Sequence, residues 1–260
     1  MDNISISIFQ PSARDQSPEA RLSLLDLAAD RASSAGSVLL ICPELSLSGY
    51  DVGDKLVERT QPVTGEYSER VAEIAQLHDL AIVYGFPELE NGTRFNTAAM
   101  IGADGRMLGY HRKIHLPPGF ERSYFSAGTG VSVFDFAGWR VALLVCYDVE
   151  FPEAVRQAAM AGAELIIVPT ALAREWHMIG DLIVPARAWE NGVFLVYANW
   201  AGQEGETTYL GGSRIVGPDG ITDAQAGAAE EILTVAIDKV RVTNSRARLD
   251  YLGDLRRSQT

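Results

Sequence analysis

The sequence is short of cysteine and histidine and has no long apolar stretch. Cysteine occurs twice and histidine four times in 260 residues, and no histidine has metal-ligand spacing with the cysteines. A zinc site is therefore not expected. Two cysteines suffice for one disulfide, but free thiols in a cytoplasmic protein fit better. The N-terminus shows no signal-peptide pattern and no apolar run reaches the length of a membrane span, so we expect no membrane association.

Positive charge is also scarce. Lys and Arg number 22 against 34 Asp and Glu, and the formal net charge is -12. A negative surface repels phosphate backbones, so we expect no nucleic-acid partner. The arginines from Arg241 to Arg257 are interleaved with Asp250 and Asp254, which is typical of a solvated tail or a docking segment. No Pro/Gly/Ser-rich linker or shift in composition divides the chain, so residues 1–260 are expected to form a single domain.

Short apolar runs rich in β-branched residues alternate with amphipathic stretches. The runs predict strands at 4–9, 37–42, 80–84, 97–101, 131–136, 140–146, 165–168, 193–198, 212–216 and 231–237. The amphipathic stretches predict helices at 17–34, 65–78, 152–161 and 179–190. Turn signals at Asn91-Gly92, Asp104-Gly105 and Pro218-Asp219-Gly220 predict hairpins. This order indicates an α/β fold with sheet inside and helices outside.

Several of these strands are followed at once by a polar or reactive residue. The residues are Glu44, Cys146, Thr170 and Asn199. In α/β sheets, sites are built at the carboxyl ends of the strands. The pattern therefore predicts that these four residues lie close together.

Cys146 is the better candidate of the two cysteines for a nucleophile. It ends an apolar strand and is followed by a helix that opens at Pro152. A strand–elbow–helix junction exposes a side chain beside free backbone N–H groups, and a helix N-terminus favours a thiolate. Cys42 precedes a proline and no helix follows it, so we interpret Cys42 as structural.

A cysteine nucleophile needs a base, and two kinds are open. One is a histidine, and His111 and His115 flank Lys113. The other is Glu44, because burial raises the pKa of a carboxyl group. From its own stretch, Glu44 is equally well a solvent-facing carboxylate, and Lys113 equally well plain surface charge.

Three segments in order resemble the nitrilase (carbon–nitrogen hydrolase) superfamily. They are Pro43 to Tyr50 (PELSLSGY), Tyr110 to Leu116 (YHRKIHL) and Cys146 to Glu153 (CYDVEFPE). Shorter matches are Phe95-Asn96-Thr97, Pro169-Thr170-Ala171, Arg187 to Asn191 (RAWEN) and Gly211 to Gly220 (GGSRIVGPDG). The resemblance spans essentially the whole chain and implies the fold of that family, a four-layer α-β-β-α sandwich.

The resemblance also implies a catalytic set. Carried over, it consists of Glu44, Lys113 and Cys146, with Glu121 eight residues after the lysine. Glu44 would act as base, and Lys113 with the backbone N–H of Tyr147 would hold the oxyanion. The reaction implied is hydrolysis of an amide to a carboxylate and ammonia through a cysteine thioester, with no metal or organic cofactor.

Further positions bear on the substrate. Tyr147-Asp148 resembles the amidase branches, such as 5-aminopentanamidase-like and R-stereoselective amidases, because true nitrilases commonly place Trp-Glu there. Glu150 is either a partner for a substrate ammonium group or a structural or interface ion pair. The loop that begins at Thr170 and Ala171 borders the acyl pocket in the family, so Trp176 is either a wall of that pocket or a core residue.

Alternatives remain for the activity and the assembly. The same residues serve a nitrile hydrolase or an ω-amidase, and a non-catalytic scaffold of the same fold is the alternative from another class. Family members usually dimerise through helices next to the cysteine segment. Here these would be the helices at 152–161 and 179–190 and the region after Val240, so the resemblance implies a homodimer or a higher homo-oligomer.

Overall fold

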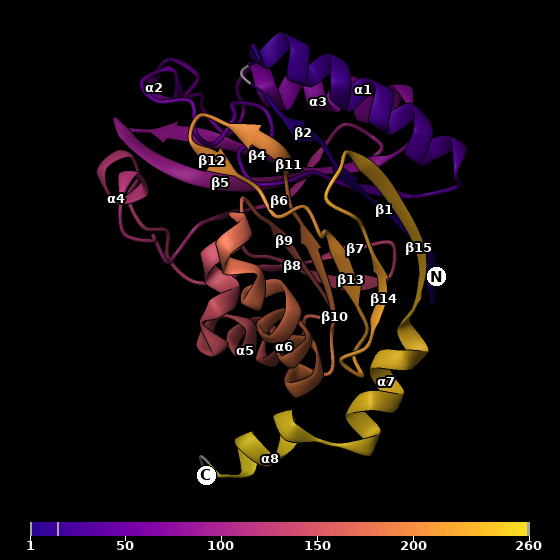
Figure 1. The fold of residues 1–260 in the computed structure, drawn as a ribbon. Helices are drawn as coiled ribbons and strands as arrows, with labels where there is room; N and C mark the ends of the chain where they lie inside the picture. The colour runs from indigo at the N-terminus through magenta and orange to yellow at the C-terminus, as the bar shows by residue number, and fades with distance from the viewer. Residues whose placement is uncertain (1, 15, 259–260) are drawn as a thin grey trace.

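The computed structural model describes residues 2–14 and 16–258. Two six-stranded sheets pack face to face, and helices cover both outer faces (Figure 1). The predicted four-layer α-β-β-α sandwich is thereby confirmed. Within the described residues, no helix combines the length and apolar character needed to cross a membrane.

Each large sheet joins a parallel centre to antiparallel edges. The first has the order β15 (Glu231–Asp238), β1 (Asn3–Gln10), β3 (Leu39–Ile41), β4 (Ala81–Glu90), β5 (Thr93–Ile101) and β6 (Met107–Arg112). The second has the order β14 (Thr222–Gln225), β13 (Arg214–Val216), β10 (Phe194–Ala198), β9 (Leu165–Pro169), β8 (Trp139–Leu143) and β7 (Val133–Phe136). β1, β3 and β4 run parallel in the first sheet, as do β8, β9 and β10 in the second. A small sheet of β12 (Thr207–Thr208), β11 (Ala201–Glu204) and β2 (Ser12–Ala13) lies beside them.

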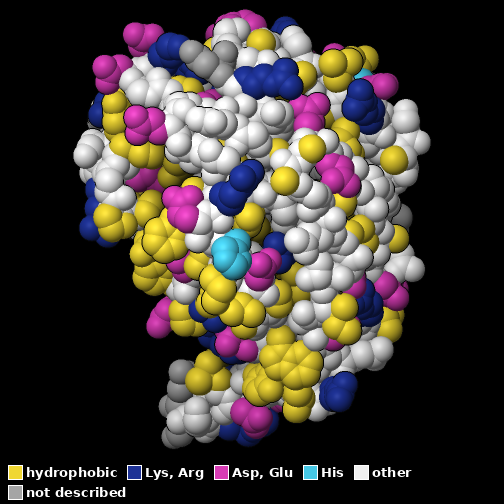
Figure 2. Space-filling model, in the orientation of Figure 1, with side chains coloured by type: hydrophobic (Ala, Val, Ile, Leu, Met, Phe, Trp, Pro, Cys, Tyr) yellow, Lys and Arg dark blue, Asp and Glu magenta, His cyan; other side chains and the backbone are white. Residues whose placement is uncertain are grey.

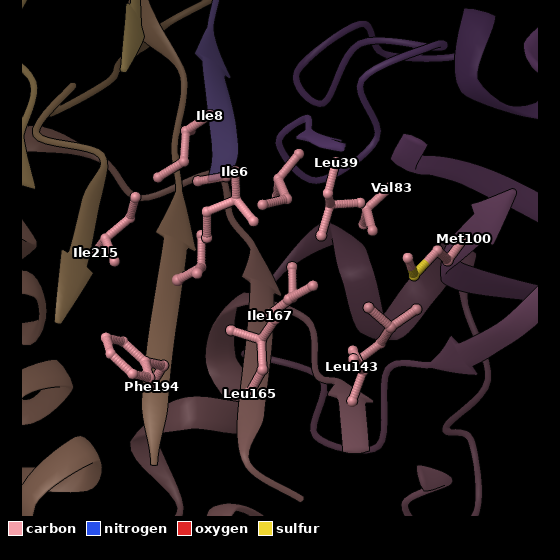
Figure 3. Close-up of a cluster of buried hydrophobic side chains, with 14 of the residues drawn as sticks. Ile6, Ile8, Leu39, Val83, Met100, Leu143, Leu165, Ile167, Phe194 and Ile215 are labelled. Carbon is pink, nitrogen blue, oxygen red and sulfur yellow. The ribbon is translucent and has the colours of Figure 1, made fainter. Parts of the chain in front are cut away.

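The main core lies between the two large sheets. Ile6, Leu39 and Val83 from the first sheet face Leu143 and Ile167 from the second (Figure 3). Successive side chains of a strand point to opposite faces. The neighbours of these residues therefore turn outward and form two further cores under the helices.

Helices form the outer layers. α1 (Pro18–Ser34) and α3 (Glu66–Leu77) pack on the first sheet, and α5 (Pro152–Met160) and α6 (Val184–Asn191) pack on the second. α1 begins where the sequence predicts, because the Ser17 hydroxyl accepts the Ala20 N–H at 3.3 Å.

The shorter helices lie in connections and near the C-terminus. They are α2 (Lys55–Glu58), α4 (Phe120–Tyr124), the 3₁₀ helices η1 (Cys146–Glu150) and η2 (Arg174–Trp176), and the π-helix η3 (Ile179–Ile183). α7 (Lys239–Arg248) and α8 (Tyr251–Ser258) follow β15 and reach past the sheets (Figure 1). Leu252 of α8 is buried in the core that α5 and α6 cover.

Two predicted boundaries are wrong at the site. The strand expected at 140–146 ends at Leu143, and Cys146 instead begins the 3₁₀ helix η1. The helix expected at 179–190 starts as the π-helix η3 and becomes α-helical at Val184. Pro185 in the first turn explains this break, since proline lacks the N–H that a continuous helix needs.

Candidate active site

The fold brings loop residues from both sheets to one place. Glu44 follows β3, Cys146 follows β8, and Thr170 follows β9. The N–H of Glu44 donates to the carbonyl oxygen of Thr170 at 3.3 Å, so the strand ends of the two sheets meet here. Asn199, after β10, binds the backbone of Leu172 and Gly211 and so fixes the loop behind Thr170.

Two carboxylates and one ammonium form a buried cluster. Lys113 Nζ donates to Glu44 Oε1 at 2.7 Å and to Glu121 Oε1 at 2.7 Å. Glu44 and Lys113 are fully buried and Glu121 is nearly so, so the surface alternatives for Glu44 and Lys113 are wrong. Asn96 Nδ2 also donates to Glu44 Oε1 at 2.7 Å, whereas Glu44 Oε2 has no hydrogen-bond partner among the described residues. One oxygen of Glu44 is therefore held, and the other is left for a reacting group.

The cluster keeps its ammonium charged and gives Glu44 the pKa of a base. Burial raises the pKa of Glu44 to about 7, although the Lys113 ammonium opposes the shift. Burial by itself would lower the pKa of Lys113, but the Glu121 and Glu44 carboxylates outweigh it and hold that pKa above its ordinary value. Near neutral pH, Glu44 can accept a proton while Lys113 stays cationic.

Cys146 sits at a sharp backbone turn. Its φ of 44° lies in the left-handed region, which is strained for residues other than glycine. The residue is buried, with an exposed fraction of 9%. Burial and the Glu44 charge raise the pKa of the thiol, while the Lys113 ammonium and the Ala171 N–H oppose that shift. A raised thiol pKa agrees with the sequence-based expectation that Cys146 needs a base.

Asp148 joins the turn that carries Cys146 to the segment that follows β6 and carries Lys113. Its carboxylate accepts the backbone N–H groups of Val145 at 3.1 Å and of His115 at 2.8 Å. It also contacts His111 Nε2 at 2.9 Å and His115 Nδ1 at 3.0 Å. Both histidines weighed as bases for Cys146 are therefore partners of Asp148, and the geometry favours Glu44.

The remaining predicted site residues differ in their placement. Thr170 and Ala171 are buried at the end of β9, and the Ala171 backbone N–H acts to lower the pKa of the Cys146 thiol. Tyr147 is half-buried with its ring edge-on to Phe151 at 5.0 Å. Trp176 has an exposed fraction of 61%, so the core alternative for it is wrong.

Sequence reasoning assigned no role to Asn96 or Asp148. Asn96 binds Glu44, and its Nδ2 also lies 3.4 Å from Glu121 Oε2. The signal was present, because both residues belong to stretches that match the family, but a match alone does not say what a side chain contacts.

Cys42 is buried under α1 with a free thiol, as a structural cysteine would be. Among the described residues, no group of three His, Cys, Asp or Glu side chains could hold a metal ion.

The comparisons with known proteins identify the family of this chain. The family model described as Carbon-nitrogen hydrolase matches residues 5–247. The chain belongs to the carbon–nitrogen hydrolase family. A Pseudomonas protegens protein named "Hydrolase in pqqF 5'region" is 38% identical over 254 residues, which cover 96% of this chain and 88% of that one. An (R)-stereoselective amidase from Pseudomonas sp. is 34% identical, with 97% and 92% covered.

A solved structure extends the comparison to the site. It is a mutant of the Nesterenkonia sp. AN1 amidase showing covalent addition of the acetamide moiety of fluoroacetamide at the active site cysteine, with a TM-score of 0.85, 36% identity and 95% of each chain covered. Another structure of this amidase is assigned to the nitrilase superfamily. The resemblance to that superfamily and its amidase branch is thus confirmed. As a carbon–nitrogen hydrolase of this branch, the chain is an amide-cleaving enzyme with a cysteine nucleophile.

Proposed function

We propose that this carbon–nitrogen hydrolase converts small aliphatic primary amides, amino-substituted ones included, to a carboxylate and ammonia. The supporting observation is the buried cluster of Glu44, Lys113 and Glu121 next to the strained Cys146. A thiol beside a base with a pKa of about 7 and a fixed cation suits acyl transfer near neutral pH.

The proposed first half-reaction forms a thioester. Glu44 Oε2 takes the thiol proton, and the sulfur of Cys146 attacks the carbonyl carbon of the amide. The electron pair of the carbonyl moves to its oxygen, which Lys113 and the Tyr147 N–H stabilise. Glu44 then gives its proton to the amide nitrogen, the carbon–nitrogen bond breaks, and ammonia leaves.

The second half-reaction returns the enzyme to its starting state. Glu44 takes a proton from water, and the hydroxide formed attacks the thioester carbonyl. The carbon–sulfur bond breaks, Cys146 regains its proton from Glu44, and the carboxylic acid leaves and gives its proton to the released ammonia in solution. Glu121 holds Lys113 throughout, and Thr170 and Ala171 border the substrate beside the sulfur.

Ammonia release tests the activity. The panel contains butanamide, hexanamide, 5-aminopentanamide, an ω-amide of a keto acid, and butanenitrile, measured for the wild type, Cys146→Ala and the control Cys42→Ala. We expect release from the simple amides that Cys146→Ala abolishes and Cys42→Ala keeps. Preference for the nitrile or the keto-acid amide would favour those alternatives, and no release from any compound would favour a scaffold.

Glu150 supports the amino-substituted substrate. It ends η1 with its side chain half-buried, and its backbone carbonyl accepts from Arg187 at 3.0 Å. Among the described residues its carboxylate has no hydrogen bond or ion pair, and burial raises its pKa against the opposing Lys113 charge. A structural ion pair within the chain is therefore wrong, and we propose that the carboxylate receives a substrate ammonium group.

A pair of substrates tests Glu150. 5-Aminopentanamide carries an ammonium group, and hexanamide is a neutral analogue of the same length. Glu150→Gln should lower the ratio of their kcat/KM values by about fivefold to tenfold, since a partly desolvated charge pair contributes roughly 1–1.4 kcal/mol. An unchanged ratio would remove Glu150 from substrate binding.

Trp176 remains a proposed wall of the acyl entrance. Its exposed ring lies in η2, which follows the loop that begins at Thr170. Trp176→Ala should shift the preference towards longer acyl chains, and an unchanged acyl-length profile would count against this role.

We also propose that the enzyme forms a homodimer through the layer of α6 and α8. Large apolar side chains are exposed there, namely Met178, Leu182, Trp189, Leu249 and Tyr251. Figure 2 shows hydrophobic side chains gathered in the lower part of the face where α6 and α8 lie. Exposed apolar patches of this kind mark interaction sites.

The two free thiols support a cytoplasmic location.

A further inference from the structure

Two aromatic residues that the proposed mechanism does not use bind its two carboxylate residues. The Tyr50 hydroxyl donates to Glu121 Oε1 at 2.7 Å. The Trp200 indole N–H donates to the backbone carbonyl of Glu44 at 2.8 Å. Each catalytic glutamate is therefore held by one aromatic donor from a segment distant in the sequence.

A single buried ion pair anchors both donors. Arg21 of α1 and Glu204 of β11 are joined at 2.5 Å, and their side chains are 3% and 1% exposed. Glu204 Oε2 accepts the backbone N–H of Tyr50 at 2.8 Å, which fixes the loop that carries the phenol. The Arg21 guanidinium lies over the Trp200 ring, 5.1 Å from its centre.

Stability alone does not account for this ion pair. Removing two charges from water costs several kcal/mol per ion, and well-packed apolar residues often stabilise a fold equally well. A buried pair does give a fixed geometry, because each charge must keep its partner. The geometry fixed here is that of the two side chains that reach Glu44 and Glu121.

The Tyr50 hydroxyl is placed to control Lys113. Glu121 Oε1 accepts from Tyr50 and from Lys113, both at 2.7 Å, so the two donors share one oxygen. Burial and the Glu121 and Glu44 carboxylates raise the pKa of Tyr50, so its proton stays on the hydroxyl and Tyr50 is the donor. The ring is fixed edge-on to Phe120 at 5.0 Å.

We propose that Tyr50, anchored by Arg21 and Glu204, is a positioning residue that keeps Lys113 divided between Glu121 and Glu44. The proposal rests on the function proposed above. Without the hydroxyl, Glu121 has one donor fewer and draws the ammonium away from Glu44. Lys113 then holds the oxyanion less well, and Glu44 loses part of the positive charge that lowers its pKa.

The test compares Tyr50→Phe with Tyr209→Phe. Tyr209 is a buried tyrosine that packs near Tyr50 with its hydroxyl 3.5 Å from Glu204, so it is a matched control. Tyr50→Phe should lower kcat about 10- to 100-fold, the value of one charge-assisted hydrogen bond, with KM within about twofold. The acid limb of its pH profile should move to higher pH. Tyr209→Phe should keep the wild-type kcat and limb.

A second readout needs no turnover. The rate at which iodoacetamide alkylates Cys146, followed by intact mass over a pH series, also reports the base that removes the thiol proton. If the wild type releases no ammonia but Tyr50→Phe still shifts this alkylation profile upward, the positioning role stands and the proposed function fails. If the wild type hydrolyses amides, and Tyr50→Phe matches Tyr209→Phe in both the turnover profile and the alkylation profile, the positioning role is overturned. An equal loss of kcat in both variants, together with a lowered thermal midpoint, would also overturn the positioning role. That result would show that the two tyrosines act only on the stability of the fold.

Discussion

In the proposed mechanism, Glu44 meets two requirements that oppose each other. It must be ionised to take the Cys146 proton, and it must be basic enough to do so near neutral pH. Burial raises the pKa of Glu44 and so makes it basic enough. The ammonium of Lys113 limits this rise, so that Glu44 can still be ionised near neutral pH. In that mechanism Oε2, which has no hydrogen-bond partner among the described residues, accepts the thiol proton. This arrangement replaces the histidine base common in other cysteine hydrolases.

The pH dependence of the reaction follows from Glu44. Its pKa is raised from 4.5 to about 7, so the ionised base is lost as pH falls through about 7. We expect kcat/KM on a neutral amide to fall tenfold per pH unit well below that point, with the fold intact by circular dichroism. An acid limb near an ordinary carboxyl value of about 4.5 would contradict the role of Glu44 as the base.

The loop that carries Glu44 depends on the strand beside it. β4 passes so close that a Cβ added at Gly85 would lie 2.4 Å from the backbone nitrogen of Leu45. The Gly85 N–H and carbonyl also bind Ser46 and Leu47 of the same loop. Only glycine fits here, and the strand thereby sets the position of Glu44.

Gly85→Ala should therefore damage activity more than stability. The added Cβ displaces the Glu44 loop, and we expect a loss of about 1–3 kcal/mol in the free energy of unfolding with a far larger relative fall in kcat. Gly92→Ala, in the β4–β5 turn where a Cβ meets nothing within 4 Å, is the control and should keep kcat despite its strained φ. Equal kcat in the two variants would show that Gly85 does not position the loop.

The sequence predicts the regular elements well and the site geometry less well. Runs such as 165–168 are apolar on both faces and read plainly as central strands, as β9 is. β6 and β14 are edge strands without a long apolar run, so only the turn signals before them, at Asp104-Gly105 and Pro218-Asp219-Gly220, indicated them. The local sequence around Glu44 and around Lys113 did not show whether each charge is buried or exposed. Each charge is buried because it pairs with the other, and the two residues lie 69 positions apart in the chain.

The molecule as a whole exposes apolar side chains unevenly. Met178, Leu182 and Trp189 are 52%, 56% and 38% exposed on the layer that adjoins the Cys146 segment. A second copy covering this layer would bury them and hold η1 through the Arg187 contacts to Val149 and Glu150. Dimerisation would then support the catalytic turn as well as stability.

Sedimentation tests this assembly. Leu182→Glu combined with Trp189→Glu should shift the enzyme from dimer to monomer, because each buries a charge in the proposed interface. Leu27→Glu combined with Leu77→Glu alters two residues that are more exposed, on the opposite helix layer, and should leave the dimer intact. A dimer that survives the first pair, or dissociates with the second, would place the interface elsewhere.

The central claim is that Cys146 carries the acyl group of an amide. The direct measurement is tandem mass spectrometry of enzyme quenched by acid during turnover of butanamide, in a Cys42→Ala background that leaves one cysteine. We predict a butanoyl group on the peptide that contains Cys146, removed by hydroxylamine and absent in Glu44→Gln. Ammonia release with no acyl group on Cys146 at any time, or with the group on another residue, would contradict the account.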